Sequence, residues 1–323
     1  MGILVAKTAA TPGSSEGGVF ARVRIALFAL ALTFTAASAV AQAAGAAVAP
    51  ASAPAQPAAS VQPAPAAAPS GLVKVPDGRL LAPDVARIVS RGELIVAMLG
   101  VDTPPFFYER NGEWVGLEVD LAKAIAKELG VQVKFNRSAK TFNGVVDIVA
   151  RGEADIAISK LSRTLARTQV IAFSQPYLVM NHALILNRVK FAQFARDRAL
   201  PEVIRGFTGS VGVIAKSSFA DYARRYFPNA KIVEYPGWPE VLKALDRGEV
   251  IGAYRDEFEV KRILKADPTA SLVLRTVTFK DLEDTLGIAV GINDHVLLAF
   301  INEFLSQRTE KLNITKVLSA LDK

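Results

Sequence analysis

The chain has 323 residues, with 38 Lys and Arg against 31 Asp and Glu, which gives a formal net charge of +7. It has no cysteine, which excludes disulfides, thiolate metal sites, cysteine nucleophiles and a cysteine-linked lipid anchor. Two histidines make a histidine-rich metal site a poor candidate, so we expect neither a metal nor a cofactor. The basic surplus is small and scattered, which argues against nucleic-acid binding.

The first 41 residues have the pattern of a secretory signal peptide. Arg22 and Arg24 precede an apolar run over residues 25–37, and small residues with the Ala-x-Ala spacing of a cleavage site follow. We predict cleavage after Ala41, with Ala39 as the second choice. A transmembrane anchor is the alternative, but the run is shorter than the ~20 residues that cross a bilayer. We therefore expect a periplasmic protein without a lipid anchor.

Residues 42–80 are predicted to form a disordered tether. Up to residue 70 this segment is almost entirely Ala, Pro, Gln and Ser, so it lacks the side chains that would form a core. The remaining residues, 81–323, are numerous enough for two lobes with separate cores.

Strands alternate with helices along this folded body. Arg-Gly-Glu occurs three times, at 91–93, 151–153 and 247–249, each time after a helical pattern and before an apolar run. In each copy we expect the glycine to end the helix in a left-handed turn. The predicted strands are Leu94–Met98, Asp155–Ser159, Ser210–Ile214 and Val250–Tyr254, and the predicted helices are Asp120–Leu129, Phe142–Ala150, Trp238–Leu245 and Glu257–Lys265. This alternation predicts an α/β fold with mostly parallel sheets.

Polar side chains follow the carboxyl ends of these strands, where open α/β sheets bind ligands. Thr164 can cap a helical turn that holds Arg167, and an arginine there can bind a carboxylate with two hydrogen bonds. Asp256 can neutralise an ammonium group, so the pair fits an α-amino acid. Each residue also has a structural alternative: Arg167 could form a surface ion pair, Asp256 could cap the next helix, and the strand-end serines could cap helices.

From about Arg91 onward, the sequence resembles the bacterial extracellular solute-binding proteins of family 3, the periplasmic polar-amino-acid receptors of ABC importers. The stretches that carry the resemblance are Pro105-Phe106-Phe107-Tyr108, Gly116-Leu117-Glu118-Val119-Asp120-Leu121-Ala122, Gly152-Glu153-Ala154-Asp155-Ile156, Leu161-Ser162-Arg163-Thr164 with Arg167, Phe173-Ser174-Gln175-Pro176-Tyr177, Val211-Gly212-Val213 and Gly287-Ile288-Ala289-Val290. Their order and spacing cover nearly the whole folded body, which makes the resemblance specific.

The resemblance implies a two-lobed periplasmic binding protein fold of type II. In this fold each lobe is a mostly parallel sheet flanked by helices, and two hinge strands let the lobes close around a ligand. We place lobe 1 at residues 81–184 and 286–323 and lobe 2 at residues 185–285. The chain would cross between the lobes near Asn181–Leu186 and Glu283–Gly287.

The resemblance also implies roles for single residues. Arg167 corresponds to the anchor for the ligand carboxylate, and Asp256 corresponds to the partner of the ligand ammonium. The other expected ligand-binding residues are Phe142 as an apolar wall, Ser159, Ser162, Ser217 and Ser218 as small polar contacts, and Lys160, Leu161 and Tyr108. Tyr108 could replace the stacking aromatic residue that many relatives carry where this chain has Thr103. Lys160 and Arg255 either face solvent or make the pocket cationic, in which case an acidic ligand side chain would be favoured.

We therefore expect a monomeric receptor that binds a polar or acidic amino acid, or a related small carboxylate, and passes it to an ABC permease without catalysis. An exported cyclohexadienyl dehydratase is the main alternative, because these enzymes share the fold and carry a catalytic Glu three residues after the pocket Asp, where this chain has Glu259. Glu259 could instead lie on an exposed helix face and pair with Lys261 or Arg262. A ligand-sensing module of a signalling protein is disfavoured, because no membrane span or further domain follows the predicted lobes.

Overall fold

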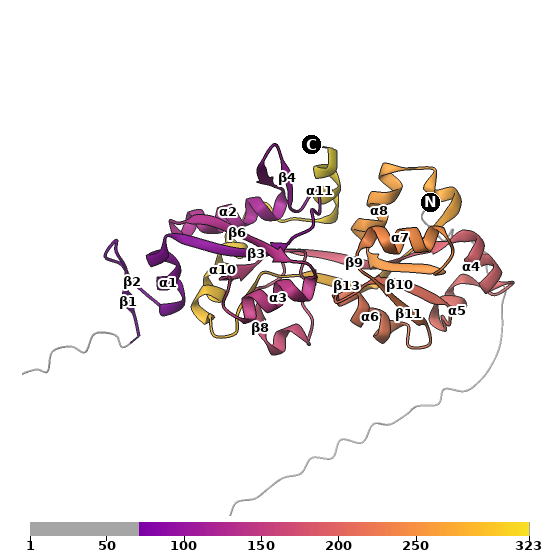
Figure 1. The fold of residues 1–323 in the computed structure, drawn as a ribbon, viewed down its shortest axis with the longest axis horizontal. Helices are drawn as coiled ribbons and strands as arrows, with labels where there is room; N and C mark the ends of the chain where they lie inside the picture. The colour runs from indigo at the N-terminus through magenta and orange to yellow at the C-terminus, as the bar shows by residue number, and fades with distance from the viewer. Residues whose placement is uncertain (1–70, 323) are drawn as a thin grey trace, which may run out of the picture. The chain divides into compact units, whose positions relative to one another are not determined.

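Two five-stranded sheets carry the fold of residues 71–322, the part of the chain that the computed structural model describes (Figure 1). The first sheet has the order β6-β3-β7-β14-β8, with strands Gln132–Ala139, Glu93–Leu99, Ile156–Ala157, Ala289–Gly291 and Ile171–Phe173. The second has the order β11-β10-β12-β9-β13, with strands Lys231–Tyr235, Ser210–Ile214, Gly252–Asp256, Leu178–Asn187 and Leu274–Leu286. The short strands β4 (Tyr108–Arg110) and β5 (Glu113–Val115) form a separate hairpin.

The centre of each sheet is parallel, as predicted. In the first sheet β3 pairs in parallel with β6 and β7, and in the second β10 pairs in parallel with β11 and β12. Antiparallel strands complete both sheets, namely β14 in the first and β9 and β13 in the second. The α/β class is therefore confirmed, with mixed rather than purely parallel sheets.

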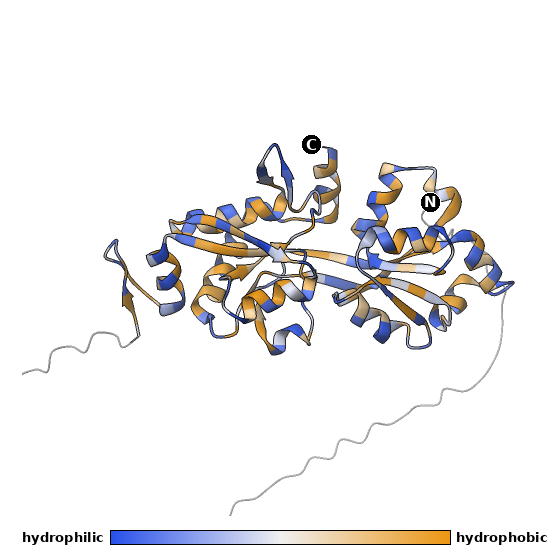
Figure 2. Ribbon diagram, viewed as in Figure 1, coloured by the Kyte–Doolittle hydropathy of each residue, from blue (hydrophilic) through white to orange (hydrophobic). Residues whose placement is uncertain are grey.

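Helices flank both sheets. Those that accompany the first sheet are α1 (Pro83–Arg91), α2 (Leu117–Leu129), α3 (Phe142–Ala150) and α10 (His295–Gln307), while α11 (Ile314–Ser319) contacts β9 and α8 (Glu257–Ala266). Those that accompany the second are α4 (Arg188–Ala195), α5 (Leu200–Arg205), α6 (Ser218–Tyr226), α7 (Trp238–Asp246), α8 (Glu257–Ala266) and α9 (Ala270–Val273). Hydrophobic and hydrophilic residues alternate along most of them (Figure 2), as expected for helices that bury one face against a sheet.

The three Arg-Gly-Glu motifs end helices α1, α3 and α7, as predicted. Gly92, Gly152 and Gly248 have φ angles of 76°, 72° and 69°, in the left-handed region that side chains with a Cβ avoid. Each glycine thereby turns the chain from a helix back into the next strand segment.

Strands β9 and β13 connect the two sheets. β9 follows β8 of the first sheet, β13 precedes β14 of the first sheet, and the two strands pair antiparallel with a register shift between Phe279 and Glu283. The first crossing lies earlier than predicted, because residues 182–186 already pair with β12 inside the second sheet. The crossing segments are therefore Leu178 to Met180 and Asp284 to Leu286, which pair with each other. The residues at which one lobe ends and the other begins remain a prediction.

The predicted tether differs from the structure at its carboxyl end. Residues 73–81 form a small hairpin in which β1 (Val73–Lys74) pairs with β2 (Leu80–Leu81), and Val75 is buried. Residues 1–70, with the predicted signal peptide and the Ala/Pro-rich segment, lie outside the described residues. Among residues 71–322, no helix has the length and apolar character needed to cross a membrane.

Candidate functional site

The loops that follow strands of the two sheets meet around a small cavity of about 10 Å3. We call the residues that line it the central site; they are Phe142, Lys160, Ser162, Ser218, Phe219, Arg255, Asp256 and Asp284. Direct contacts join the two loop sets, since the Ser218 hydroxyl donates to Ser162 Oγ at 2.8 Å and Lys160 Nζ lies 3.2 Å from Asp256 Oδ2. Five of the predicted ligand-binding residues therefore come together here.

Arg167 lies beside the central site as a buried cation. It begins a 3-10 turn (Arg167–Gln169) whose N-cap is Ala166 rather than the predicted Thr164, although the Arg167 backbone N–H donates to Thr164 Oγ1 at 3.3 Å. The guanidinium donates to the Ser162 carbonyl at 2.9 Å and to Asn143 Oδ1 at 3.0 Å. It is 6% exposed and forms no ion pair with an Asp or Glu of residues 71–322. A surface ion pair is therefore the wrong interpretation of Arg167.

Burial lowers the pKa of Arg167, and the nearby charge of Asp284 only partly offsets this effect. A buried charge without a hydrogen-bonded counter-ion is unfavourable, because the attraction that would compensate for lost hydration is missing. Two neutral acceptors satisfy only two of the five N–H groups of the guanidinium. The arrangement is suited to an anion supplied from outside the chain.

Lys160 occupies the position where an ammonium partner of Asp256 was expected to bind. Its Nζ lies 3.2 Å from Asp256 Oδ2 and 3.2 Å from Glu259 Oε1, and all three side chains are buried. The ammonium also lies over the rings of Phe106 and Phe258, at 4.7 and 4.9 Å from their centroids. Such cation–π contacts favour a desolvated ammonium group. Lys160 therefore does not face solvent.

The backbone of Lys160 is held by a buried carboxylate. Lys160 has a φ of 46°, unusual for a residue with a side chain, and its N–H donates to both carboxylate oxygens of Glu118, at 2.9 and 3.2 Å. The Tyr177 hydroxyl donates to the same carboxylate. Burial raises the pKa of Glu118 to about 7, although these hydrogen bonds act in the opposite direction.

Asp256 is both the predicted site residue and a helix cap. It is 1% exposed, ends β12, and accepts the Glu259 N–H at 3.2 Å as the N-cap of α8. Arg255 Nε lies 3.5 Å from Asp256 Oδ2, in addition to the contact from Lys160. Both interpretations of Asp256 are therefore compatible, but its carboxylate already has cationic partners within the chain.

Arg255 is buried in an aromatic box rather than exposed. Its guanidinium lies 5.3 Å from the ring centroid of Phe142, 5.7 Å from that of Phe219 and 5.9 Å from that of Trp238. Its Nε forms no hydrogen bond, and neither does Trp238 Nε1. Lys160 and Arg255 therefore both point into the site, but the carboxylates of Asp256 and Asp284 line the same cavity, so whether the pocket favours an acidic ligand remains a prediction.

Asp284 is a central-site residue that the sequence analysis did not single out. It lies on β13 in the crossing segment, is 1% exposed and has no hydrogen-bond partner at Oδ1. Burial raises its pKa to about 6, a hydrogen bond from Ser162 lowers it, and the charge of Asp256 raises it further. No Lys or Arg of the described residues forms an ion pair with it. Its only sequence signal was its place in a predicted crossing.

Glu259 is buried, not on an exposed helix face. Its carboxylate pairs with Lys160 at 3.2 Å and with Arg262 at 2.8 Å. Burial alone would raise its pKa, but the charges of Lys160, Arg255 and Arg262 outweigh burial and hold the pKa well below the usual value. A general acid must carry a proton near neutral pH. These surroundings keep Glu259 ionised and do not favour the catalytic role considered for it.

Four other predicted ligand-binding residues lie away from the central cavity. Ser159 Oγ accepts the Leu99 N–H at 2.9 Å, and the Ser217 hydroxyl donates to the Ile214 carbonyl at 2.6 Å, so both hydroxyls brace their own loops. Leu161 is fully buried, and its carbonyl accepts the Gly287 N–H. Tyr108 lies half-buried in the β4–β5 hairpin. None of the four lines the central cavity.

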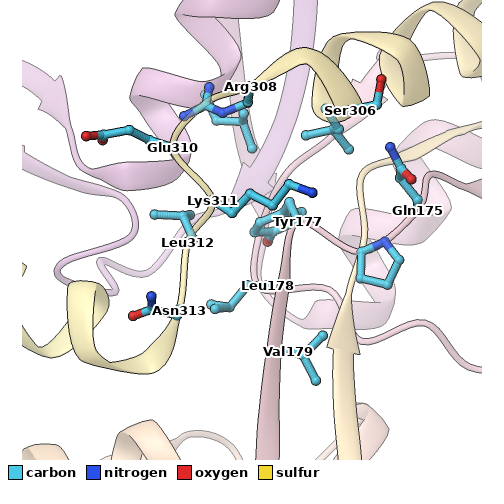
Figure 3. Close-up of a pocket in the computed structure, with 13 residues that line it drawn as sticks. Gln175, Tyr177, Leu178, Val179, Ser306, Arg308, Glu310, Lys311, Leu312 and Asn313 are labelled. Carbon is cyan, nitrogen blue, oxygen red and sulfur yellow. The ribbon is translucent and has the colours of Figure 1, made fainter.

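Larger hollows also lie outside the central site. An outer cavity of about 530 Å3 adjoins it, because Phe142 and Arg255 line both, and Trp238, Lys140 and Arg262 complete much of its wall. A groove of about 380 Å3 is lined by residues from segments 175–179 and 305–313 (Figure 3) and contains none of the predicted ligand-binding residues. The outer cavity is therefore the hollow that lies next to the candidate site.

The family of the chain follows from comparison with known proteins. Residues 94–319 match the model of the bacterial extracellular solute-binding proteins, family 3. The chain belongs to this family. Its fold is the two-lobed type II periplasmic binding protein fold, as the solved structures of similar proteins show.

Individual relatives are moderately similar. The ABC transporter arginine-binding protein 1 of Escherichia coli is 26% identical over 63% of this chain and 80% of the relative. An amino acid ABC transporter substrate-binding protein from Streptococcus pneumoniae, solved bound to L-arginine, is 25% identical with a TM-score of 0.58, over 73% of this chain and 97% of that structure. An ancestral amino-acid-binding protein, described as a precursor of cyclohexadienyl dehydratase, is 26% identical with a TM-score of 0.55, over 74% and 96%.

Proposed function

We propose that this family 3 protein binds a polar amino acid, or a related small carboxylate, in the periplasm and delivers it to the permease of an ABC importer. The observation that carries this proposal is Arg167, a buried guanidinium without a carboxylate partner among the described residues. A ligand carboxylate would supply the missing counter-ion with charge-assisted hydrogen bonds. The L-arginine-bound relative supports an amino acid as the ligand class.

Hinge closure is the proposed means of capture. The central cavity of about 10 Å3 is at most large enough for one water molecule, so a ligand enters only after the two loop sets separate. Strands β9 and β13 are the segments that would bend, since they connect the sheets. The contacts Ser162–Ser218 and Lys160–Asp256 join the loop sets directly and would break on opening. A ligand that binds both loop sets would favour the closed form.

The buried cations bear on the choice of ligand. Arg255 and Lys160 add positive charge inside the site, and Arg255 also lines the outer cavity. A polar or acidic side chain that reaches this cavity could accept hydrogen bonds from Arg255 Nε and Trp238 Nε1, neither of which forms a hydrogen bond within the protein. We accordingly propose a ligand whose side chain carries oxygen acceptors, with Phe142 as its apolar wall.

The test compares Arg167→Met with Arg163→Met, a control in the same loop whose side chain is exposed. Thermal-shift screening of the twenty amino acids, dicarboxylates and opines first finds binders of the wild type, and calorimetry then gives their affinities. We expect Arg167→Met to weaken binding at least ~100-fold, because a buried charge-assisted pair is lost, and Arg163→Met to change it less than ~3-fold. Retained affinity in a folded Arg167→Met variant would contradict the proposal.

A further inference from the structure

Two buried groups of opposite charge in this site lack an ion-pair partner among residues 71–322. Arg167 is bonded only to neutral acceptors, and Asp284 has no partner at Oδ1. The two groups influence each other electrostatically but do not form an ion pair. Buried charges are normally paired. An unpaired cation and an unpaired anion beside one cavity fit a ligand that carries both charges.

The negative charge of Asp256, the expected partner of the ligand ammonium, is already compensated by cations of the chain. Its carboxylate contacts Lys160 Nζ at 3.2 Å and Arg255 Nε at 3.5 Å, and it accepts the Glu259 N–H. A ligand ammonium would have to displace Lys160, which also pairs with Glu259 and lies against two aromatic rings. A side chain attached to the same molecule competes at a high effective concentration, in the millimolar range or above. A free amino acid is therefore at a disadvantage at Asp256.

Asp284 is placed to receive that ammonium. It lines the same cavity as Lys160 and Asp256, on the strand segment that crosses between the sheets. Ser218 donates to Ser162, Ser162 and Asp284 line the same cavity, and Asp284 Oδ1 is buried without a hydrogen-bond partner. An ammonium bound at Oδ1 would supply both the hydrogen bond and the counter-charge that this carboxylate lacks.

We propose that Asp284, not Asp256, binds the α-ammonium of the amino acid whose carboxylate binds Arg167. Lys160 is then a counter-ion from the chain itself, which pairs with Asp256 and Glu259. This inference rests on the proposed function, because it assigns a second contact of the same ligand. It predicts that the protein no longer recognises the ligand's ammonium when the charge of Asp284 is removed. Recognition should persist when the charge of Asp256 is removed.

The test uses amino acids paired with analogues that lack only the α-amino group: L-arginine with 5-guanidinopentanoate, and L-glutamate with glutarate. Calorimetry gives the ratio of the two affinities within each pair, which reports on the ammonium contact alone. The variants are Asp284→Asn and, as the matched control, Asp256→Asn, in which asparagine can still cap α8. Circular dichroism and thermal melting verify that both variants fold.

We expect the wild type to bind one of these amino acids at least ~30-fold more tightly than its analogue, because a buried ammonium–carboxylate pair is made. Asp284→Asn should reduce this ratio to within ~3-fold of unity, and Asp256→Asn should leave it nearly unchanged. Should Asp284→Asn fail to fold, a crystal structure of the wild type with the bound amino acid decides the question. Its ammonium nitrogen would lie within hydrogen-bonding distance of Asp284 or of Asp256.

The possible failures are distinguishable. A ratio that collapses in Asp256→Asn but not in Asp284→Asn, or an ammonium found on Asp256, overturns the assignment and leaves the proposed function intact. An analogue that binds the wild type as tightly as its amino acid also overturns the assignment and leaves a carboxylate receptor. A wild type that binds neither member of either pair, and none of the twenty amino acids, refutes the proposed function and the assignment with it.

Discussion

The buried carboxylate of Glu118 makes a contribution to stability that we expect to be lost as the pH rises toward neutrality. Glu118 lies on α2, is fully buried, and binds the Lys160 N–H and the Tyr177 hydroxyl. The perturbation we consider is Glu118→Gln, which keeps the shape of the side chain and an oxygen acceptor but removes its titration. The matched control is Glu128→Gln, an exposed position on the same helix.

The magnitude follows from the pKa of Glu118, which burial raises from 4.5 to about 7. The folded state then holds the proton more tightly than the unfolded state, so the favourable contribution is complete below pH 4.5 and is lost as the pH rises to 7. Each pKa unit corresponds to ~1.4 kcal/mol, which gives a loss of ~3 kcal/mol across this window. Asp284, whose pKa burial raises to about 6, acts in the same direction in both proteins.

Urea denaturation at a series of pH values from 4.5 to 8 measures the effect. We expect the free energy of unfolding of Glu118→Gln, relative to that of the wild type, to increase by ~3 kcal/mol over this range. The difference between Glu128→Gln and the wild type should stay nearly constant. Parallel curves for wild type and Glu118→Gln would refute the reasoning, because they would mean that Glu118 is not buried as a titrating group.

Two further predictions concern Lys160 and catalysis. Lys160→Met leaves the buried carboxylates of Asp256 and Glu259 without their shared ammonium, so urea denaturation should show a loss of ~3 kcal/mol or more. The exposed control Lys140→Met should change stability by less than ~0.5 kcal/mol, and an unaffected Lys160→Met would contradict the assigned ion pairs. Incubation with prephenate or arogenate should give neither phenylpyruvate nor phenylalanine, because the cations around Glu259 keep it ionised. Enzyme-dependent formation of either product would establish the dehydratase alternative.

Much of the fold could be predicted because it depends on local patterns. The helix Phe142–Ala150 and the strand Ser210–Ile214 have the bounds that were predicted, and the glycine of each Arg-Gly-Glu motif has the expected left-handed conformation. The first crossing was placed too late because β9 is one continuous strand, and nothing local in its sequence marks His182 as the residue where pairing with β12 begins. Pairing partners far apart in the sequence, rather than local propensity, determine that boundary.

The surroundings of a site residue could be predicted only where the sequence motif also forms the loop that positions that residue. Arg167 follows Ser162 and Thr164 at a fixed spacing, and the short turn delivers it to the interior. Lys160 and Asp284 were not assigned their surroundings, because a lysine in a loop and an aspartate on a strand usually face solvent. Lys160 packs against Phe258, and Asp284 lies beside Ser162. In each pair the partner comes from a distant part of the chain.

The position of Lys160 has a consequence for how ligand specificity can change in this fold. The family resemblance assigned the ammonium contact to Asp256, and the carboxylate is still there, but a lysine from the opposite loop set now neutralises it. If the proposed assignment holds, a cation in the facing loop is enough to remove an acid from ligand recognition, without a change of the residue at the binding position. Recognition of an ammonium then requires another buried anion near Arg167, and Asp284 is the described carboxylate that lines the cavity without a cationic partner. Identity of the residue at the motif position therefore does not fix its role, because the role depends on which charges the closed loops bring against it.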